Sequence, residues 1–137
     1  MKLFTYGYGS IPIENAIEYL KGHGVSHVVD VRYSPNSRNP SYRRAALEAA
    51  LKGSGLLYTH LPELGNVNYK LTLPSGAIRL SDADGGFRKL HPLVAQAWAT
   101  GGAVCILCVC KRPDGCHRRL VSDTFQSVYD GITVHDL

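Results

Sequence analysis

The chain has 137 residues, 45% of them hydrophobic and 19% charged, and a formal net charge of +4. This length suits one domain, and no apolar run approaches the ~20 residues that a membrane-spanning helix needs. The first ten residues, MKLFTYGYGS, hold one lysine and a short apolar patch, too little for a signal peptide. We therefore expect a cytoplasmic protein without a membrane partner, whose cysteines are reduced thiols.

Short β-rich runs alternate with helical patterns along the chain. We predict strands over 3–7, 27–32, 56–60, 103–110 and 132–135, and helices after a Ser10 cap and over 41–52, 91–100 and 116–129. Such alternation predicts a single α/β domain over 1–137, with a mostly parallel five-stranded sheet and helices on both faces, Rossmann- or flavodoxin-like. The continuous apolar run from Val104 to Val109 is typical of a central strand that is buried on both sides.

Residues 64–86 have the weakest pattern. The portion KLTLPSGAIRL predicts either a hairpin around Pro74, Ser75 and Gly76 or a long loop. A loop of this length in a small domain is often functional, for example as a lid, and a poorly packed insertion is the alternative.

Unusual polar residues follow several predicted strands. Parallel α/β sheets bind ligands beyond the carboxyl ends of their strands. The residues at those ends are Tyr8, Asp30, Arg32, Tyr58, His60, Cys108 and Cys110, with CHRR from Cys116 just beyond. The two-residue period of a strand puts Asp30 and Arg32 on one side. We expect a functional crevice at this edge; a structural ion pair and a packing role for His60 are the alternatives.

The spacing of Cys105, Cys108 and Cys110 resembles a zinc-binding pattern. In an extended strand, however, Cys105 and Cys108 lie ~10 Å apart and on opposite faces, so they cannot share one tetrahedral ion. We therefore interpret Cys105 as a small core residue. A metal site that draws on Cys108, Cys110, Cys116, His117 or His60 stays open as an alternative.

Cys116 and His117 lie at or next to the first turn of a predicted helix. The free N–H groups and the positive dipole end there favour an anion, and they lower the pKa of a thiol below its usual ~8.5. Three interpretations stay open. Backbone amides and arginines hold a phosphate, or Cys116 is a nucleophile with His117 or His60 moving protons, or Cys116 is a small buried residue.

Basic residues gather in two parts of the chain. Eight of the 15 are Arg32, Arg38, Arg43, Arg44, Lys111, Arg112, Arg118 and Arg119. If the fold brings the two groups together, they attract phosphate; otherwise they are two solvated loops.

Four short motifs run in order along the chain: T-x-G, D-V-R-x-x-P-x-S-R, Y-x-H-L-x-E-L-G and C-H-R, the last at Cys116 to Arg118. Together they resemble the domain-of-unknown-function 488 family. The resemblance implies a small α/β domain whose motif residues gather at one site, and it supplies no reaction. Two positions depart from the family's usual pattern, which often has histidine at Tyr8 and an acid at Cys110. A tyrosine, with a pKa of ~10, is a poor base at neutral pH.

Our leading hypothesis is a protein that binds a phosphate-bearing ligand, either a nucleotide or a nucleic-acid end, and acts on it as a hydrolase or group-transfer enzyme. The candidate catalytic residues are Asp30, His60, Cys116 and His117. The candidate ligand-binding residues are Tyr8, Arg32, Arg38, Tyr58, Glu63 and Arg118. We predict no cofactor.

Two alternatives come from other classes of protein. A non-catalytic nucleic-acid-binding module would use residues 37–44, with Tyr42 stacking on a base. A metal or redox protein would use Cys110, Cys116 and His117, either to hold a metal or to form a Cys110–Cys116 disulfide.

Overall fold

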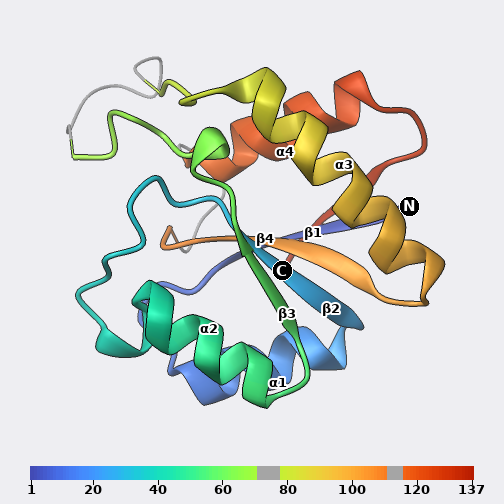
Figure 1. Ribbon diagram of the computed structural model, residues 1–137. Helices are drawn as coiled ribbons and strands as arrows, with labels where there is room; N and C mark the ends of the chain where they lie inside the picture. Colours follow the sequence, from blue (N-terminus) through green and yellow to red (C-terminus); the bar gives the residue numbers. More distant parts are fainter. Residues whose placement is uncertain (71–77, 111–115) are drawn as a thin grey trace.

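A computed structural model describes residues 1–70, 78–110 and 116–137, and its centre is a five-stranded parallel sheet (Figure 1). The strand order is β3-β2-β4-β1-β5. Every neighbouring pair of strands is parallel. The strands are β1 Lys2–Gly7, β2 Val25–Asp30, β3 Leu57–His60, β4 Ala103–Cys108 and β5 Thr133–Asp136. The predicted α/β class is confirmed, and β4 takes the central position that its apolar run indicated.

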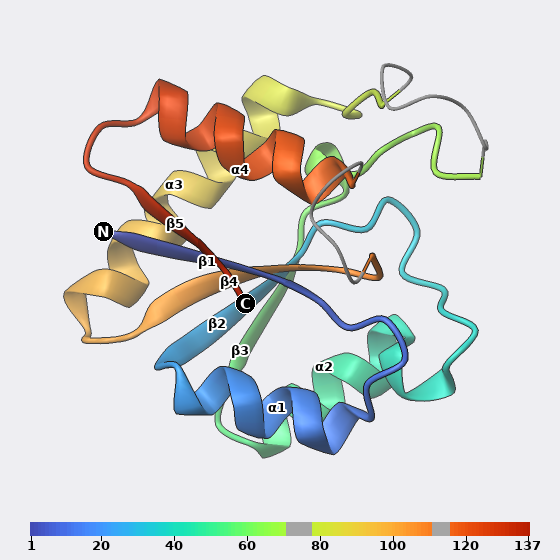
Figure 2. The same cartoon turned by 180° about the vertical axis from the view of Figure 1, so that it is seen from behind.

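Two helices cover each face of the sheet. Figures 1 and 2 show α1 and α2 on one side and α3 and α4 on the other. The helices are α1 Ile13–Gly22, α2 Arg44–Gly53, α3 Ala83–Ala99 and α4 His117–Val128, with short 3-10 helices η1 Pro40–Tyr42 and η2 Pro62–Leu64. The arrangement is doubly wound, as in Rossmann-type folds, but β4 lies between β1 and β2, which differs from the usual Rossmann strand order.

The sheet divides the hydrophobic core into two layers. Val94, Val121 and Phe125 belong to the layer under α3 and α4. Leu20 and Leu51 belong to the layer under α1 and α2. Because successive side chains of a strand point to opposite faces, each buried strand contributes to both layers.

Two predicted helix starts are wrong. Ser10 does not cap α1, because the helix begins at Ile13 and Pro12, with φ −58° and ψ 143°, is its N-cap. The predicted helix over 91–100 is longer and begins at Ala83, where the Asp82 side chain caps it by accepting a hydrogen bond from the backbone N–H of Gly85 at 3.1 Å. The helix continues through the exposed Pro92, whose missing N–H removes the usual helical donor for the carbonyl of Arg88.

The predicted helix over 41–52 is divided in two. The 3-10 helix η1 ends at Tyr42, Arg43 is extended, and α2 begins at Arg44. The ends of the predicted 64–86 insertion meet in an antiparallel bridge between Asn66 and Leu80. The hairpin expected at 74–76 and the basic residues Lys111 and Arg112 lie outside the described residues.

None of the helices in the described part of the chain is both long and apolar enough to cross a bilayer.

Candidate functional site

The carboxyl ends of the central strands are level with one another. Gly7 of β1 pairs with Cys108 of β4, and Asp30 of β2 lies between Leu107 of β4 and His60 of β3. Beyond these ends is a cavity of about 930 Å³, here called the edge cavity. Its lining comes from Tyr8–Ser10, Arg32–Ser34, Asn36–Asn39, Asn66, Asn68, Tyr69, Ile78, Cys108–Cys110, Cys116 and His117. The predicted crevice therefore has a physical counterpart at the expected edge.

Asp30 and Arg32 form a buried bidentate ion pair. Arg32 donates from Nη2 to Asp30 Oδ2 at 2.6 Å and from Nε to Oδ1 at 2.8 Å. Its Nη1 donates to the Tyr8 hydroxyl at 3.1 Å and to the carbonyl of Tyr42 at 2.7 Å. Burial lowers the pKa of Arg32, but the hydrogen bond and charge of Asp30 outweigh burial and raise it. Much of the Arg32 charge is therefore neutralised inside the protein, which supports a structural role.

Tyr58 and His60 also support this ion pair. The Tyr58 hydroxyl donates to Asp30 Oδ2 at 2.6 Å, and burial raises the pKa of that hydroxyl well above its usual value. His60 Nε2 donates to the carbonyl of Arg32 at 2.7 Å. Neither side chain is among the described residues that line the edge cavity. A catalytic role for Asp30 or His60 stays a prediction, and their contacts in this structure hold the loop after β2.

Arg118 and Glu63 are not among the described residues that line the edge cavity. The Arg118 side chain is fully buried, where Nη1 donates to Thr5 Oγ1 at 2.9 Å and Nη2 to the carbonyl of Cys110 at 3.1 Å. Glu63 is paired with Lys89 of α3 at 2.8 Å. The expected direct contact of these two residues with a ligand is therefore not supported by their positions.

Three cysteines meet on the inner wall of the edge cavity. Cys108 ends β4, Cys116 is the N-cap of α4, and Cys110 is exposed between them. The sulfurs of Cys108 and Cys116 are 3.6 Å apart, and those of all three lie within 4.8 Å of one another. We call these residues the thiol cluster. Cys105 lies in the core layer on the opposite face, as predicted, and burial raises its pKa.

His117 faces the thiol cluster in a defined orientation. Its Nε2 lies 2.7 Å from the carbonyl oxygen of Val31, and its Nδ1 lies 3.7 Å from Cys108 Sγ. A carbonyl only accepts hydrogen bonds, so Nε2 carries a proton and Nδ1 is turned toward the sulfur. His117 is itself buried, and the geometry places an imidazole nitrogen beside a thiol.

Within the thiol cluster, the contacts of Cys116 favour the ionised form of its thiol. Hydrogen bonds from the Cys108 and Cys110 thiols, together with His117 and the Arg118 backbone N–H, lower the pKa of Cys116 far below its usual value. The hydrogen bond with Cys108 contributes most to raising the pKa of Cys110. Burial lowers the pKa of His117, but the Cys116 thiolate and the Val31 carbonyl outweigh burial and raise it. These contacts at the start of α4 favour a negative charge on the Cys116 sulfur.

Two exposed tyrosines that the sequence analysis did not single out line the outer part of the edge cavity. Tyr33 and Tyr69 are 41% and 47% exposed, and their ring centroids are 6.1 Å apart. Arg38, which was predicted, is exposed and lines the same part, with the amides and hydroxyls of 34–39 around it. The available signal was the density of Ser and Asn in 34–39 and 66–68, which is also typical of ordinary turns.

Tyr42 is not available for stacking on a base. Its side chain is fully buried against the Tyr8 ring, with the centroids 3.8 Å apart and the planes 7° from parallel. Its hydroxyl donates to the carbonyl of Ile11 at 2.7 Å. The stacking role that the nucleic-acid-module alternative gave to Tyr42 is therefore wrong.

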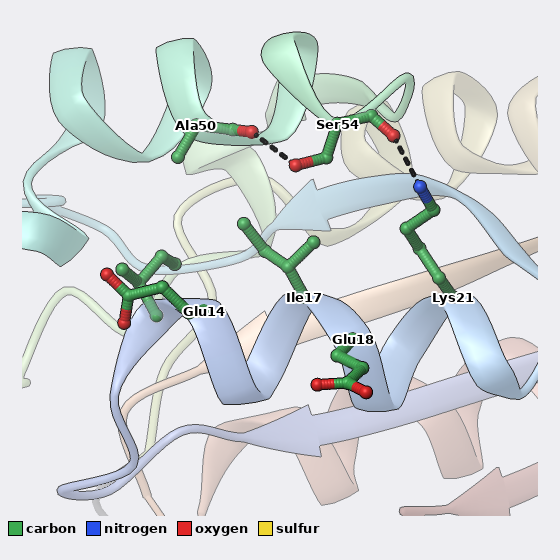
Figure 3. Close-up of a pocket in the computed structure, with 7 residues that line it drawn as sticks. Glu14, Ile17, Glu18, Lys21, Ala50 and Ser54 are labelled. Carbon is green, nitrogen blue, oxygen red and sulfur yellow. Dashed lines mark hydrogen bonds between the residues drawn. The ribbon is translucent and has the colours of Figure 1, made fainter.

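A second cavity of about 520 Å³ lies between α1 and α2 (Figure 3). Lys21 closes one end by donating from Nζ to the carbonyl of Ser54 at 2.9 Å. The other polar side chains that line it include Glu14 and Glu18 of α1. It is a groove between two helices that contains none of the strand-end residues, so we assign it no function.

Comparison with known protein families gives one match. The model of a family described as "Domain of unknown function DUF488" matches residues 12–74. The resemblance to the DUF488 family is confirmed. The matched span contains Asp30, Arg32 and Arg38, and it ends before the thiol cluster. No curated protein and no solved structure matches the chain.

Proposed function

We propose that the edge cavity binds a phosphate-bearing ligand, either a nucleotide or the end of a nucleic-acid strand. The observation that carries the proposal is the pairing of Arg38 with two exposed tyrosines around one cavity. Its volume of about 930 Å³ is within the range of roughly 300–1,000 Å³ that is usual for small-molecule sites. Its position beyond the strand ends is where α/β folds usually hold ligands.

Arg38 is the group that we assign to the phosphate. A guanidinium binds phosphate oxygens through two parallel hydrogen bonds. The loop around Arg38 is held by internal contacts: Ser37 Oγ accepts from the Asn39 backbone N–H at 3.1 Å, and the Tyr8 hydroxyl contacts the same oxygen at 3.2 Å. Asn39 in turn caps η1 by accepting from the Ser41 backbone N–H at 3.1 Å. A loop that is ordered before binding loses less entropy when the ligand arrives.

Tyr33 and Tyr69 are the groups that we assign to a nucleobase. Aromatic rings stack on any base, with a gain of about 1–3 kcal/mol per base. The segment that carries Tyr69 is braced by Asn66, whose Oδ1 accepts from the backbone N–H groups of Asn68 at 3.0 Å and Arg79 at 3.1 Å. The ring is therefore attached to a defined turn.

If the protein transforms the bound ligand, Cys116 and His117 are the residues to which we assign catalysis. These two candidate catalytic residues line the edge cavity. A thiolate beside an imidazole is suited to nucleophilic attack with proton transfer. Enzymatic action therefore stays part of the proposal, with hydrolysis or group transfer as the reaction type.

The direct test is calorimetric titration of the full chain with inorganic phosphate, mononucleotides and a short single-stranded oligonucleotide. We expect Arg38→Ala to weaken nucleotide binding at least about tenfold, because a charge-assisted hydrogen bond is lost. Arg88→Ala is the matched control, since Arg88 is exposed on α3 and is not among the described lining residues. Equal affinity of both variants for every phosphate ligand, or no binding at all, would refute the proposal.

The salt dependence of the same titrations identifies the kind of ligand. A nucleic-acid strand loses affinity steeply as salt rises, because its binding releases condensed counterions. The affinity of a mononucleotide held in a pocket falls much less as the salt concentration rises. Tight mononucleotide binding would favour a nucleotide pocket, and binding of the oligonucleotide alone would favour a strand end.

A further inference from the structure

The thiol cluster has a geometry that the proposed ligand binding does not use. Its three sulfurs come from three short segments, at the end of β4, in the residues after it and at the N-cap of α4. We propose that Cys108, Cys110 and Cys116 together bind one soft metal cation as thiolates, at the inner wall of the edge cavity. Zn²⁺ is the ion with which we would test this site.

The spacing of the sulfurs suits such an ion. A tetrahedral zinc site has Zn–S bonds of ~2.3 Å, which separates neighbouring sulfurs by about 3.8 Å. Cys108 and Cys116 are already 3.6 Å apart, and no pair in the cluster exceeds 4.8 Å. Small side-chain rotations therefore bring all three sulfurs to bonding distance of one ion, without a change in the sheet.

The backbone around the cluster holds its members in place. The carbonyl of Cys110 accepts from Arg118 Nη2 at 3.1 Å, and a Cβ at Gly7 would lie 1.5 Å from that carbonyl oxygen. Cys108 ends the central strand, where it pairs with Gly7 of β1 and its carbonyl accepts from the backbone N–H of Tyr8 at 3.1 Å. A site with its ligands fixed before binding loses little conformational freedom when the ion arrives.

His117 gives the cluster a feature that is usual around bound metals. Metal-bound histidines commonly donate their other ring N–H to a backbone carbonyl, as His117 Nε2 does to Val31 at 2.7 Å. Its Nδ1 lies 3.7 Å from Cys108 Sγ, beside the three sulfurs. The exposure of Cys110 gives an ion a route from solvent.

The chemistry of the ligands sets the class of cation. Thiolates are soft ligands that select Zn²⁺ or Cu⁺ over Mg²⁺ and Ca²⁺. When the ion binds, the metal–sulfur bonds replace the S–H bonds of the protonated thiols, and those protons pass to solvent. The guanidinium of Arg118, in contact with the carbonyl of Cys110, partly compensates the net negative charge of three thiolates around a divalent ion.

The experiment is a titration of the reduced, untagged, chelator-treated full chain with Co²⁺ and then Zn²⁺. We expect one Co²⁺ per chain with thiolate-to-cobalt charge-transfer absorption, displaced by one Zn²⁺ that native mass spectrometry also counts. Cys110→Ser should bind at least about tenfold more weakly, because the loss of even an outer-sphere contact has effects of that size. Cys110 is exposed, so this variant should fold, as circular dichroism would verify.

Cys105→Ala is the matched control. It removes a buried cysteine from the opposite face of the sheet and leaves the thiol cluster intact, so its metal binding should equal that of the wild type. The proposal fails if the reduced wild type binds neither ion stoichiometrically, or if Cys110→Ser binds as tightly as Cys105→Ala. Because no phosphate ligand is present, these outcomes are independent of the function proposed for the cavity.

Discussion

The buried guanidinium of Arg118 donates to the carbonyl oxygen of Cys110 at 3.1 Å, directly beside the Cα of Gly7. This contact joins α4 to the residues after β4, eight positions earlier, and both lie against the end of β1, which is far away in the sequence. The other side of the guanidinium donates to Thr5 Oγ1 at 2.9 Å. Arg118, which the motif pattern suggested as a ligand-binding residue, thus fixes one wall of the cavity from behind.

The close packing at Gly7 predicts a large effect of a single methyl group. In Gly7→Ala the Cβ would lie 1.5 Å from the carbonyl oxygen of Cys110, and the backbone must move to relieve the overlap. We expect a loss of about 1–3 kcal/mol in the free energy of unfolding, measured by urea denaturation. Gly22→Ala is the control, because a Cβ there would meet no atom within 4 Å beyond its chain neighbours and the backbone of its own helix. Equal stability of the two variants would contradict this packing.

The ion pair of Asp30 and Arg32 predicts strong coupling between the two positions. Asp30→Asn leaves the buried Arg32 guanidinium without its counter-charge, and we expect a loss of about 3–5 kcal/mol. Asp130→Asn, at an exposed position after α4, should change stability by less than about 0.5 kcal/mol. In a double-mutant cycle, Arg32→Met should recover part of the loss in Asp30→Asn. Strictly additive effects would show that the pair is not energetically linked.

In the thiol cluster, we expect the buried Cys116 to react at lower pH than the exposed Cys110, which is the reverse of the order that exposure alone predicts. In the reduced, metal-free protein, Cys116 should react with iodoacetamide at a midpoint pH well below the usual ~8.5, because its pKa is lowered. Cys110 should require a more alkaline pH although it is exposed, because its pKa is raised. Peptide mass spectrometry after labelling at a series of pH values measures both midpoints. Labelling of Cys110 before Cys116 at neutral pH would contradict the assignment.

Burial of His27 is expected to lower the free energy of unfolding of the protein in mild acid. Its burial in β2 lowers its pKa, so the unfolded chain binds a proton more readily than the folded protein does. The free energy of unfolding should therefore fall as the pH drops below the unfolded value of ~6.5, and it should be insensitive to this group above that pH. His27→Gln should show a shallower decline between pH 7 and pH 5 in urea denaturation. An unchanged slope would mean that His27 does not contribute.

Local patterns were sufficient for the fold class. Alternating strand and helix signals predicted the parallel sheet, and the apolar run from Val104 to Val109 identified its central strand, which ends at Cys108. The strand period also predicted that Asp30 and Arg32 share a side and that Cys105 and Cys108 do not. These inferences succeed because each depends on spacing within one segment, which the backbone geometry of that segment sets.

Helix starts were less predictable. The helix predicted at His91 begins at Ala83, where the short side chain of Asp82 caps it and Phe87 and Leu90 are buried under it. Pro92 was the misleading signal, since proline is usual in the first turn of a helix and rare inside one. Burial of an apolar face against the sheet outweighed the missing hydrogen bond.

The sequence by itself determined the order of the elements, the α/β class and the gathering of polar residues at one edge of the sheet. Only the tertiary structure decided how those residues are used. It enclosed the Asp30–Arg32 pair with Tyr8 and Tyr58, placed Arg118 behind the cavity wall, buried Tyr42 against Tyr8 and brought three cysteines together. The reason is physical: spacing within a segment is set by local backbone geometry, whereas the partner of a charge or a thiol depends on segments that only packing brings into contact.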